Sequence, residues 1–275
     1  MPQLTPKDRQ LLTQARDLLE TPSLAARMTH LIGAPLENAL KKLPATTHAK
    51  IGEVTRLSLE KVAQGAGLTL DPTSKAPSRP GIHKALVAAS GAFGGAMGIA
   101  GLALELPVST GLIFRSILEI AREQGEDITD VQTLIEALTV FALGGNSALD
   151  DGTETGYFAI RGVLAKAVTE ATAHLAAKGL SREAAPPLIR LLTQIASRFS
   201  VQVTEKSAAQ LVPIIGAVGG ASINVAFMSH FQDMARGHFV LRRLERIYGE
   251  RIIQELYESS GGNNSSGTAK GLERV

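Results

Sequence analysis

Residues 85–104 read ALVAASGAFGGAMGIAGLAL and contain no charged side chain. A second stretch, residues 207–232, also lacks formal charge. Glycines recur at a spacing of four residues in both stretches, as at Gly91 and Gly95. Because residues four apart share one face of a helix, this spacing predicts helices whose backbones pack closely. We therefore predict an all-α fold, a multi-helix bundle in which two glycine-rich apolar helices pack together.

The predicted helix-packing face consists of glycines. Its members are Gly91, Gly94, Gly95, Gly98, Gly101, Gly216, Gly219 and Gly220. Each glycine costs roughly 0.5–1 kcal/mol relative to Ala inside a helix, so tight helix contact or lipid has to offset several at once. A bilayer span needs about 20 apolar residues, a length that both stretches reach. Gly and Ala dominate them and Trp is absent, which favours a buried hairpin or reversible insertion over permanent spanning.

The composition of the 275 residues excludes several classes of function. Positive and negative side chains nearly balance at a net charge of +2, so a general nucleic-acid-binding surface is not expected. The absence of cysteine excludes disulfides, thiolate metal sites and a thiol nucleophile, and is typical of a reducing compartment. The first thirty residues carry too much charge for a secretory signal. We expect a cytoplasmic location, with no cofactor and no metal.

Apolar periodicity and capping signals predict helices along most of the chain. Thr5 is typical of a helix N-cap, and Gly125 of a helix end. Pro107 predicts a break or kink. Thr129 and Gln132 form a capping-box pair. Prolines favour extended backbone before them, so the proline-rich run marks the main boundary. The predicted parts are an N-terminal helical region at 1–70, a proline-rich linker at 71–80, a helical domain at 81–258 and a disordered tail at 259–275.

Three polar side chains near the apolar stretches are weak candidates for catalysis. A carboxylate at Glu105, at the end of the first stretch, is costly unless paired, so it is either a buried acid or metal ligand or, as we favour, a helix-end residue that caps amides or pairs with Arg115. His230 and Asp233 share a helix face at i,i+3. Two such groups are too few for a metal site, and no catalytic motif accompanies them. A site therefore requires Glu105, His230 and Asp233 to converge.

Basic side chains flank both apolar stretches. The candidate contacts to anionic lipid headgroups are Arg79, Lys84, Arg236, Arg242, Arg243 and Arg246. Each cation near a membrane surface contributes about 1 kcal/mol to binding. A solvated helix face with ion pairs to Glu245 and Glu250 explains the same residues equally well. Both interpretations stay open at the level of the sequence.

The run ASGAFGGAMGIAGLALELP at 89–107, which continues to RSILEIAREQG at 115–125, resembles the bacterial EcsC family. The run KSAAQLVPIIGAVGGASIN at 206–224, followed by 230–243, looks like the closing region of that family. The resemblance covers residues 80 to 250 and leaves residues 1 to 70 outside. The positions that match its pattern are Gly91, Gly95, Gly98, Glu105, Pro107, Arg115, Gly216, Gly220 and Asn224.

The resemblance implies an intracellular helical protein connected with membrane or secretion processes, because the family is named for a companion of a bacterial ABC transporter operon. It supplies no catalytic residue. Together, sequence and resemblance predict a membrane-associated interaction or accessory protein, peripheral to or partly inserted at the inner membrane. Anionic membrane lipid is the expected partner, with an integral membrane protein such as a transporter as a second. The alternatives are a metal-assisted or lipid hydrolase using Glu105, His230 and Asp233, and a membrane-active effector.

Overall fold

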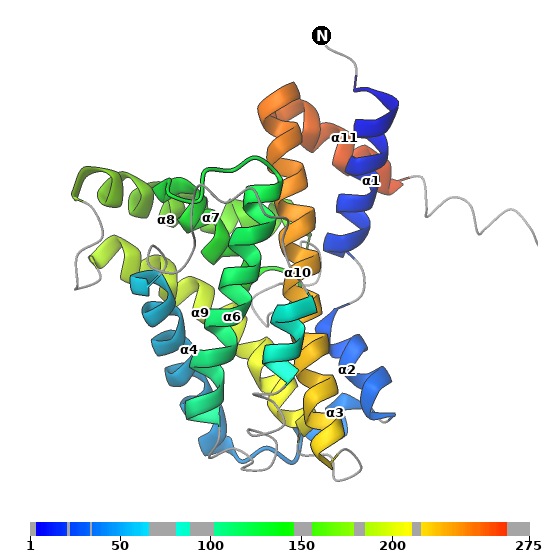
Figure 1. Ribbon diagram of the computed structural model, residues 1–275, viewed down its shortest axis with the longest axis vertical. Helices are drawn as coiled ribbons and strands as arrows, with labels where there is room; N and C mark the ends of the chain where they lie inside the picture. Colours follow the sequence, from blue (N-terminus) through cyan, green and yellow to red (C-terminus); the bar gives the residue numbers. More distant parts are fainter. Residues whose placement is uncertain are drawn as a thin grey trace, which may run out of the picture.

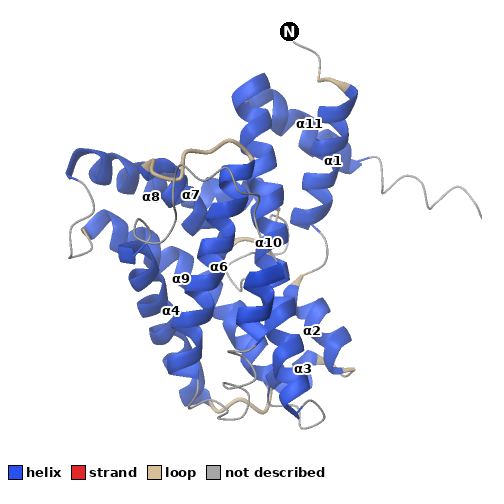
Figure 2. Cartoon of the chain, in the orientation of Figure 1, coloured by secondary structure: helices blue, strands red, loops and turns tan. Residues whose placement is uncertain are grey.

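The fold is built from helices, and no strand occurs in the part of the chain that the structure describes (Figure 2). The all-α prediction is confirmed. The computed structural model describes residues 4–20, 23–33, 35–65, 81–88, 102–145, 156–178, 185–210 and 216–262.

The helices follow one another in chain order. The first are α1 (Pro6–Glu20), α2 (Leu24–Ile32), α3 (Leu36–Leu40), α4 (Ala45–Gly65), a helical segment at residues 81–88, and α6 (Leu102–Glu123). The others are α7 (Val131–Thr139), the 3-10 turn η2 (Val140–Ala142), α8 (Tyr157–Lys178), α9 (Pro186–Gln210), α10 (Gly216–Tyr248) and α11 (Glu250–Gly262). The predicted tail began at residue 259, and α11 extends past that point. Residues 263–275 and the predicted linker at 71–80 lie outside the described residues.

The longest helix, α10, has 33 residues and runs through the middle of the molecule (Figure 1). α1 packs beside the half of α10 that leads to α11, whereas α2 packs against its other half. α6 and α9 also contact α10, and α4 covers both of them. α8 lies at the edge, against α7 and α9. Helices from both ends of the sequence therefore share one hydrophobic cluster.

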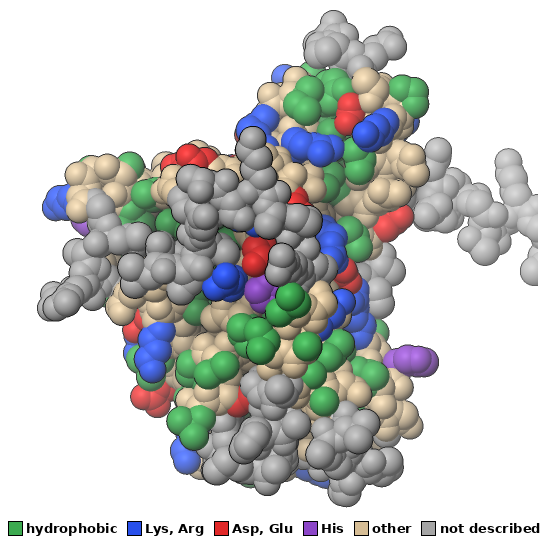
Figure 3. Space-filling model, viewed as in Figure 1, with side chains coloured by type: hydrophobic (Ala, Val, Ile, Leu, Met, Phe, Trp, Pro, Cys, Tyr) green, Lys and Arg blue, Asp and Glu red, His purple; other side chains and the backbone are tan. Residues whose placement is uncertain are grey.

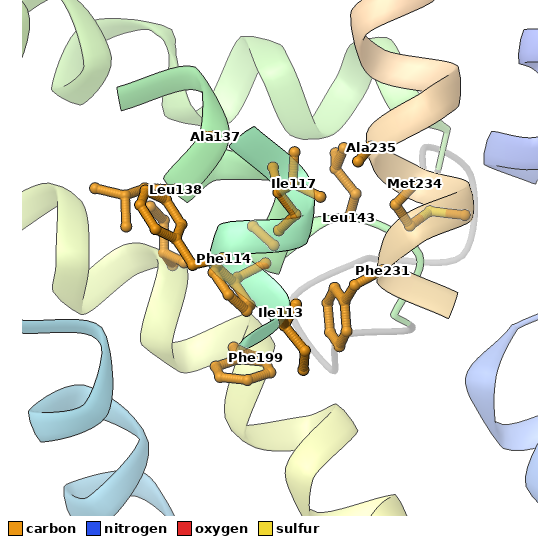
Figure 4. Close-up of a cluster of buried hydrophobic side chains, with 14 of the residues drawn as sticks. Ile113, Phe114, Ile117, Ala137, Leu138, Leu143, Phe199, Phe231, Met234 and Ala235 are labelled. Atoms are coloured by element: carbon orange, nitrogen blue, oxygen red, sulfur yellow. The ribbon is translucent and has the colours of Figure 1, made fainter. Parts of the chain in front are cut away.

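Aromatic side chains form the centre of that cluster (Figure 4). The ring of Phe141, in η2, lies 4.8 Å from the ring of Phe199 in α9 and 5.3 Å from that of Phe231 in α10. Phe114 of α6 stacks on Phe141 from another side. Tilted and edge-to-face pairs of this kind each add about 0.5–1.5 kcal/mol beyond the burial of apolar area. The aromatic centre thus joins α6, α9 and α10, the three helices that carry the site described below.

The helix ends confirm some of the local predictions and correct one. Oγ1 of Thr5 accepts a hydrogen bond from the N–H of Asp8 at 3.1 Å and so caps α1, as expected. The N-cap of α7 is Asp130, whose side chain accepts from the N–H of Gln132. The predicted capping box is wrong because Thr129 donates instead to Oδ1 of Asp127. Gly125 has φ of 82°, which favours glycine, and follows α6 as predicted.

Of the break or kink predicted at Pro107, the break does not occur, because α6 continues through this residue. A proline near the start of a helix removes only one amide from the hydrogen-bond ladder. Leu106 and Ile113, on either side of Pro107, are fully buried, so packing holds this part of α6 in place. Glu105 therefore lies inside a continuous helix.

The glycine-rich stretches are only partly visible. The predicted packing glycines Gly91, Gly94, Gly95, Gly98 and Gly101 lie outside the described residues. The second stretch is divided, because α9 ends at Gln210 and α10 begins at Gly216. Gly219 and Gly220 lie in the first turn of α10, and Gly220 is buried. Close packing of the two stretches stays a prediction. Among the described helices, none has the length and apolar character to cross a membrane.

α1 meets the end of α10 and the helix α11 that follows it. The phenol of Tyr248 donates to Asp8 at 2.7 Å, and that of Tyr257 donates to Glu20 at 2.6 Å. α1 approaches α10 closely at Gly237, where an added Cβ would lie 2.5 Å from Cγ of Leu19. The same Cβ would lie 2.9 Å from a backbone oxygen of α1, which cannot move without shifting the helix.

We expect Gly237→Ala to lower the free energy of unfolding by about 1–3 kcal/mol, because the new methyl group overpacks the contact between α1 and α10. Gly52→Ala is the matched control: a Cβ there meets no atom within 4 Å, and Ala is the better helix former. Urea unfolding followed by circular dichroism measures both. A Gly237→Ala protein as stable as the Gly52→Ala protein contradicts the prediction.

Candidate functional site

A fully buried ion pair joins α6 to α9. Nζ of Lys206 lies 2.7 Å and 2.9 Å from the two carboxylate oxygens of Glu105. The side chains are 0% and 5% exposed. Removing two charges from water is so unfavourable that proteins tolerate it only where the charges are paired and hydrogen-bonded. This geometry meets both conditions.

An amide from α10 completes the arrangement. Nδ2 of Asn224 donates to Oε1 of Glu105 and to the carbonyl oxygen of Val87, both at 3.1 Å. Nζ of Lys206 also lies 4.9 Å from the centre of the Phe227 ring, a cation–π distance. We call Glu105, Lys206, Asn224 and the Val87 carbonyl the buried polar cluster. It ties α6, α9 and α10 to the helical segment at 81–88.

Glu105 is the buried acid that one interpretation of the sequence described, but the expected pairing with Arg115 is wrong. Ten residues along a continuous helix correspond to about 15 Å of rise, beyond the reach of the two side chains. Arg115 instead faces Glu119 at 3.8 Å, and its side chain is 43% exposed. Nε2 of His83 also lies 3.1 Å from Glu119.

His230 and Asp233 do not join Glu105. The carboxylate of Asp233 pairs with Arg27 at 2.8 Å and with Arg236 at 3.1 Å. The ring of His230 is fully buried and lies so close to Gly144 that an added Cβ there would be 2.6 Å away. Burial, helped by the positive charge of Arg27, lowers the pKa of His230 to about 3, so its imidazole is neutral near pH 7.

The three candidates for catalysis therefore lie in different surroundings. His230 follows Asn224 by six residues on α10, which places it about 9 Å further along the axis and about 120° around it. Glu105 contacts Asn224, so its carboxylate packs against a different face of α10 from the one that carries His230. Within the described ranges, no group of three His, Asp or Glu side chains is arranged to hold a metal ion. The pocket that the hydrolase alternative requires is not formed by these residues.

Three of the predicted headgroup-binding arginines, Arg236, Arg242 and Arg246, are engaged in ion pairs. Arg242 lies 3.0 Å from Glu126 and 2.9 Å from Glu136, and its side chain is 12% exposed. Arg246 also pairs with Glu126 and donates to the carbonyl of Gln124. This corresponds to the ion-pair interpretation, although the carboxylates differ from those expected.

The other basic candidates are spread over several surroundings. Arg243 is half-buried on α10. Lys84 is half-buried on the helical segment at 81–88. Arg79 lies outside the described residues. Contact between these residues and lipid stays a prediction.

Lys206 is absent from the site residues that the sequence predicted. A signal for it exists: Glu105 directly follows the first uncharged stretch, and Lys206 directly precedes the second. Two opposite charges at the borders of two apolar stretches are natural partners, because neither is stable alone in an apolar interior. The pairing spans 101 residues of sequence, so no local pattern reveals it.

A second polar network lies beside a groove of about 660 Å³ between α7, α8, α10 and α11. Nδ1 of the buried His238 lies 2.9 Å from the phenol oxygen of Tyr157, and its Nε2 lies 3.3 Å from Glu136. Burial raises the pKa of Glu136, but the hydrogen bond from His238 and the charges of His238, Arg242 and Arg161 outweigh it and lower the pKa to about 2. Burial has the opposite effect on His238, whose pKa it lowers because the charged form of histidine is the protonated one.

The arginines that line the groove are paired with carboxylates of the same chain. Arg161 lies 2.6 Å from Glu245 and 3.5 Å from Glu250, and its guanidinium also covers the ring of Tyr157. Because the positive charges that line it are neutralised in this way, we interpret this network as a structural link between α8 and the C-terminal helices.

We expect Lys206→Met alone to lower the free energy of unfolding by about 3–5 kcal/mol, because it leaves the carboxylate of Glu105 buried without its partner. Glu105→Leu combined with Lys206→Met should recover most of that loss, since apolar side chains of similar size replace a buried ion pair at little cost. Urea unfolding near neutral pH tests this. A double variant at least as unstable as the sum of the two single variants refutes it.

Glu205, also on α9, should make the stability of the protein depend on pH. Burial raises its pKa to about 7, and its Oε2 makes no hydrogen bond within the described part of the chain. The folded protein therefore keeps a proton that the unfolded chain releases near pH 4.5, so stability should fall as the pH rises from about 4.5 to 7. We expect Glu205→Gln to remove up to about 3 kcal/mol of this fall. Urea unfolding should show similar stabilities at about pH 4.5 and a more stable variant at about pH 8. An equal difference at both values refutes the assignment.

The comparison with known protein families gives a match over most of the chain. The EcsC protein family matches residues 7–244, so the match begins within α1 and includes the N-terminal helices that the sequence resemblance left outside. No curated protein and no solved structure matches the chain. The buried polar cluster, with Glu105 and Asn224 among the positions that the resemblance singled out, lies inside the matched region. By this match, the chain belongs to the EcsC protein family.

Proposed function

We propose that this protein is a helical accessory protein that docks on the anionic, cytoplasmic face of the inner membrane. The observation that carries the proposal is a group of exposed apolar side chains on the helical segment at 81–88 and on the start of α6. We call it the docking patch. Its members are Ile82, Leu86, Leu104 and Val108, which are 50%, 50%, 71% and 53% exposed.

The two halves of the docking patch come together because the side-chain amide of Asn224 bridges the two elements that carry them, through the backbone carbonyl of Val87 and the side-chain carboxylate of Glu105. The acceptor oxygens of Val87 and Glu105 lie no more than about 6 Å apart, since each is 3.1 Å from the same nitrogen of Asn224. Leu86 and Leu104 each directly precede one of these residues. In Figure 3 hydrophobic side chains gather over the segment at 81–88 and the neighbouring part of α6. Apolar side chains scattered singly over a surface are ordinary, whereas a contiguous group marks an interaction site.

Lipid fits this patch better than a protein partner does. The patch lies at both ends of residues 89–101, which carry no charge and consist largely of Gly and Ala. Lys84 and Arg115 border it, the latter 43% exposed at its side chain. Apolar side chains next to a few cations are the combination that interfacial membrane binding uses, since the former enter the acyl boundary and the latter contact anionic headgroups.

The second part of the proposal concerns a protein neighbour. The family resemblance connects such chains with an ABC transporter, so we propose an integral membrane protein of that kind beside the docked molecule. Crosslinking in the native cell, followed by identification of the linked chain, tests this part separately from lipid binding. Recovery of crosslinks to soluble proteins only would argue against it.

We expect the double variant Leu86→Ser, Leu104→Ser to bind vesicles of phosphatidylglycerol and phosphatidylcholine about tenfold more weakly than the wild type, because two half-exposed leucines no longer enter the bilayer. Val163→Ser with Ile247→Ser is the matched control, since these side chains are 63% and 57% exposed but lie on α8 and α10, away from the patch. Co-sedimentation measures the affinity, and added salt should weaken it.

Three results would count against docking. They are the absence of wild-type binding to the vesicles that contain phosphatidylglycerol, equal binding by the two double variants, and wild-type binding to pure phosphatidylcholine vesicles that is as tight as binding to the anionic ones. Release of a trapped dye from the anionic vesicles would instead favour the membrane-active effector.

A further inference from the structure

We propose that Asn224 is a positioning residue that clasps the two halves of the docking patch together. The inference rests on the proposed function and deepens it, because it names the contact that fixes the shape of the membrane-binding surface. The clasp consists of two hydrogen bonds from one side-chain nitrogen, one to the backbone carbonyl of Val87 and one to the side-chain carboxylate of Glu105, which lie 18 positions apart in the sequence.

The segment at 81–88 needs such a contact. Helices in proteins owe most of their stability to tertiary packing, so the position of these residues depends on their buried contacts. Val87 and His83, four residues apart on one face, are its buried residues, and His83 faces Glu119 of α6. Ile82 and Leu86, also four apart, occupy the exposed face. Anchoring the first pair therefore holds the second pair outward.

Lys206 makes the clasp possible by fixing Glu105. Its ammonium group bonds both carboxylate oxygens, which leaves Oε1 oriented toward α10, where Nδ2 of Asn224 can use its two hydrogens for two acceptors. The side-chain amide of Asn224 is fully buried, and its Oδ1 makes no hydrogen bond in the described part of the structure. A buried amide with an unpaired oxygen is unfavourable compared with a leucine, so the contacts of Nδ2 are what its presence provides.

The consequence for membrane binding is preorganisation. When Leu86 and Leu104 are held as one surface before contact, docking loses less conformational freedom than when the two elements move independently. Loss of the clasp should therefore weaken binding even though every residue of the docking patch remains in place.

The test compares Asn224→Leu with Gln232→Leu. Gln232 is an equally buried amide on the same helix, and it also bonds α6, through Ser116 at 2.9 Å. Because the chain has no cysteine, the substitutions Ile82→Cys and Val108→Cys provide two unique sites for nitroxide labels. The distribution of distances between the two nitroxides, measured in solution without lipid, reports on the clasp. Unlabelled proteins are then measured on the phosphatidylglycerol vesicles described above. Asn224→Ser, which admits water in place of the amide, is used if the leucine variant does not fold.

We expect a narrow distance distribution in the wild type and the Gln232 variant, a broad one in the Asn224 variant, and about fivefold weaker vesicle binding in the latter only. An Asn224 variant as narrow as the wild type refutes the clasp. A broad distribution with unchanged vesicle binding refutes its role in docking. Equal weakening in both variants assigns the effect to general stability and also refutes it. If the wild type binds no vesicle, the proposed function fails, and the distance distribution then shows separately whether the clasp exists.

Discussion

The burial of the charge on Lys206 is the constraint around which the other contacts are arranged. An ammonium group that is fully enclosed needs a carboxylate, and Glu105 supplies one from another helix at 2.7 Å. The carboxylate in turn orients the amide of Asn224, which reaches the segment at 81–88. Hydrophobic packing alone allows helices to slide and rotate to some degree, whereas a movement that separates a buried ion pair leaves each charge without its partner and is strongly unfavourable. The relative positions of α6, α9 and α10 are thus specified more tightly than their apolar contacts require.

The apolar core provides the environment that makes this specification strong. Phe114, Phe141, Phe199 and Phe231 exclude water from the middle of the bundle, and Phe227 extends this protection to Lys206. In such surroundings the polar groups interact more strongly than they do in water, and they also become more costly to leave unpaired. The strength of the buried polar cluster therefore depends on the apolar core that surrounds it.

Local features of the fold followed from the sequence, and long-range features did not. Apolar periodicity and the end signals at Thr5 and Gly125 located helices, because caps and stops depend on neighbouring residues. The helix break expected at Pro107 does not occur, since the packing of Leu106 and Ile113 outweighs a single missing hydrogen bond. The partner of Glu105 lies 101 residues away, so it depends on how helices meet and not on spacing. The sequence shows that a charge at Glu105 needs a partner, but nearness in the sequence favours Arg115, which pairs with Glu119 instead.

The contacts between α1 and the C-terminal helices bear on how the chain folds as it is made. Asp8 and Tyr248 are 240 residues apart, and Glu20 and Tyr257 are 237 apart. The apolar face of α1, with Leu12 and Leu19, has no surface to cover it until α10 has left the ribosome. Closing so long a loop is also entropically slow. During synthesis the first helix therefore stays without its partner longer than the described helices that follow it, and for that interval its apolar face is a natural binding site for molecular chaperones.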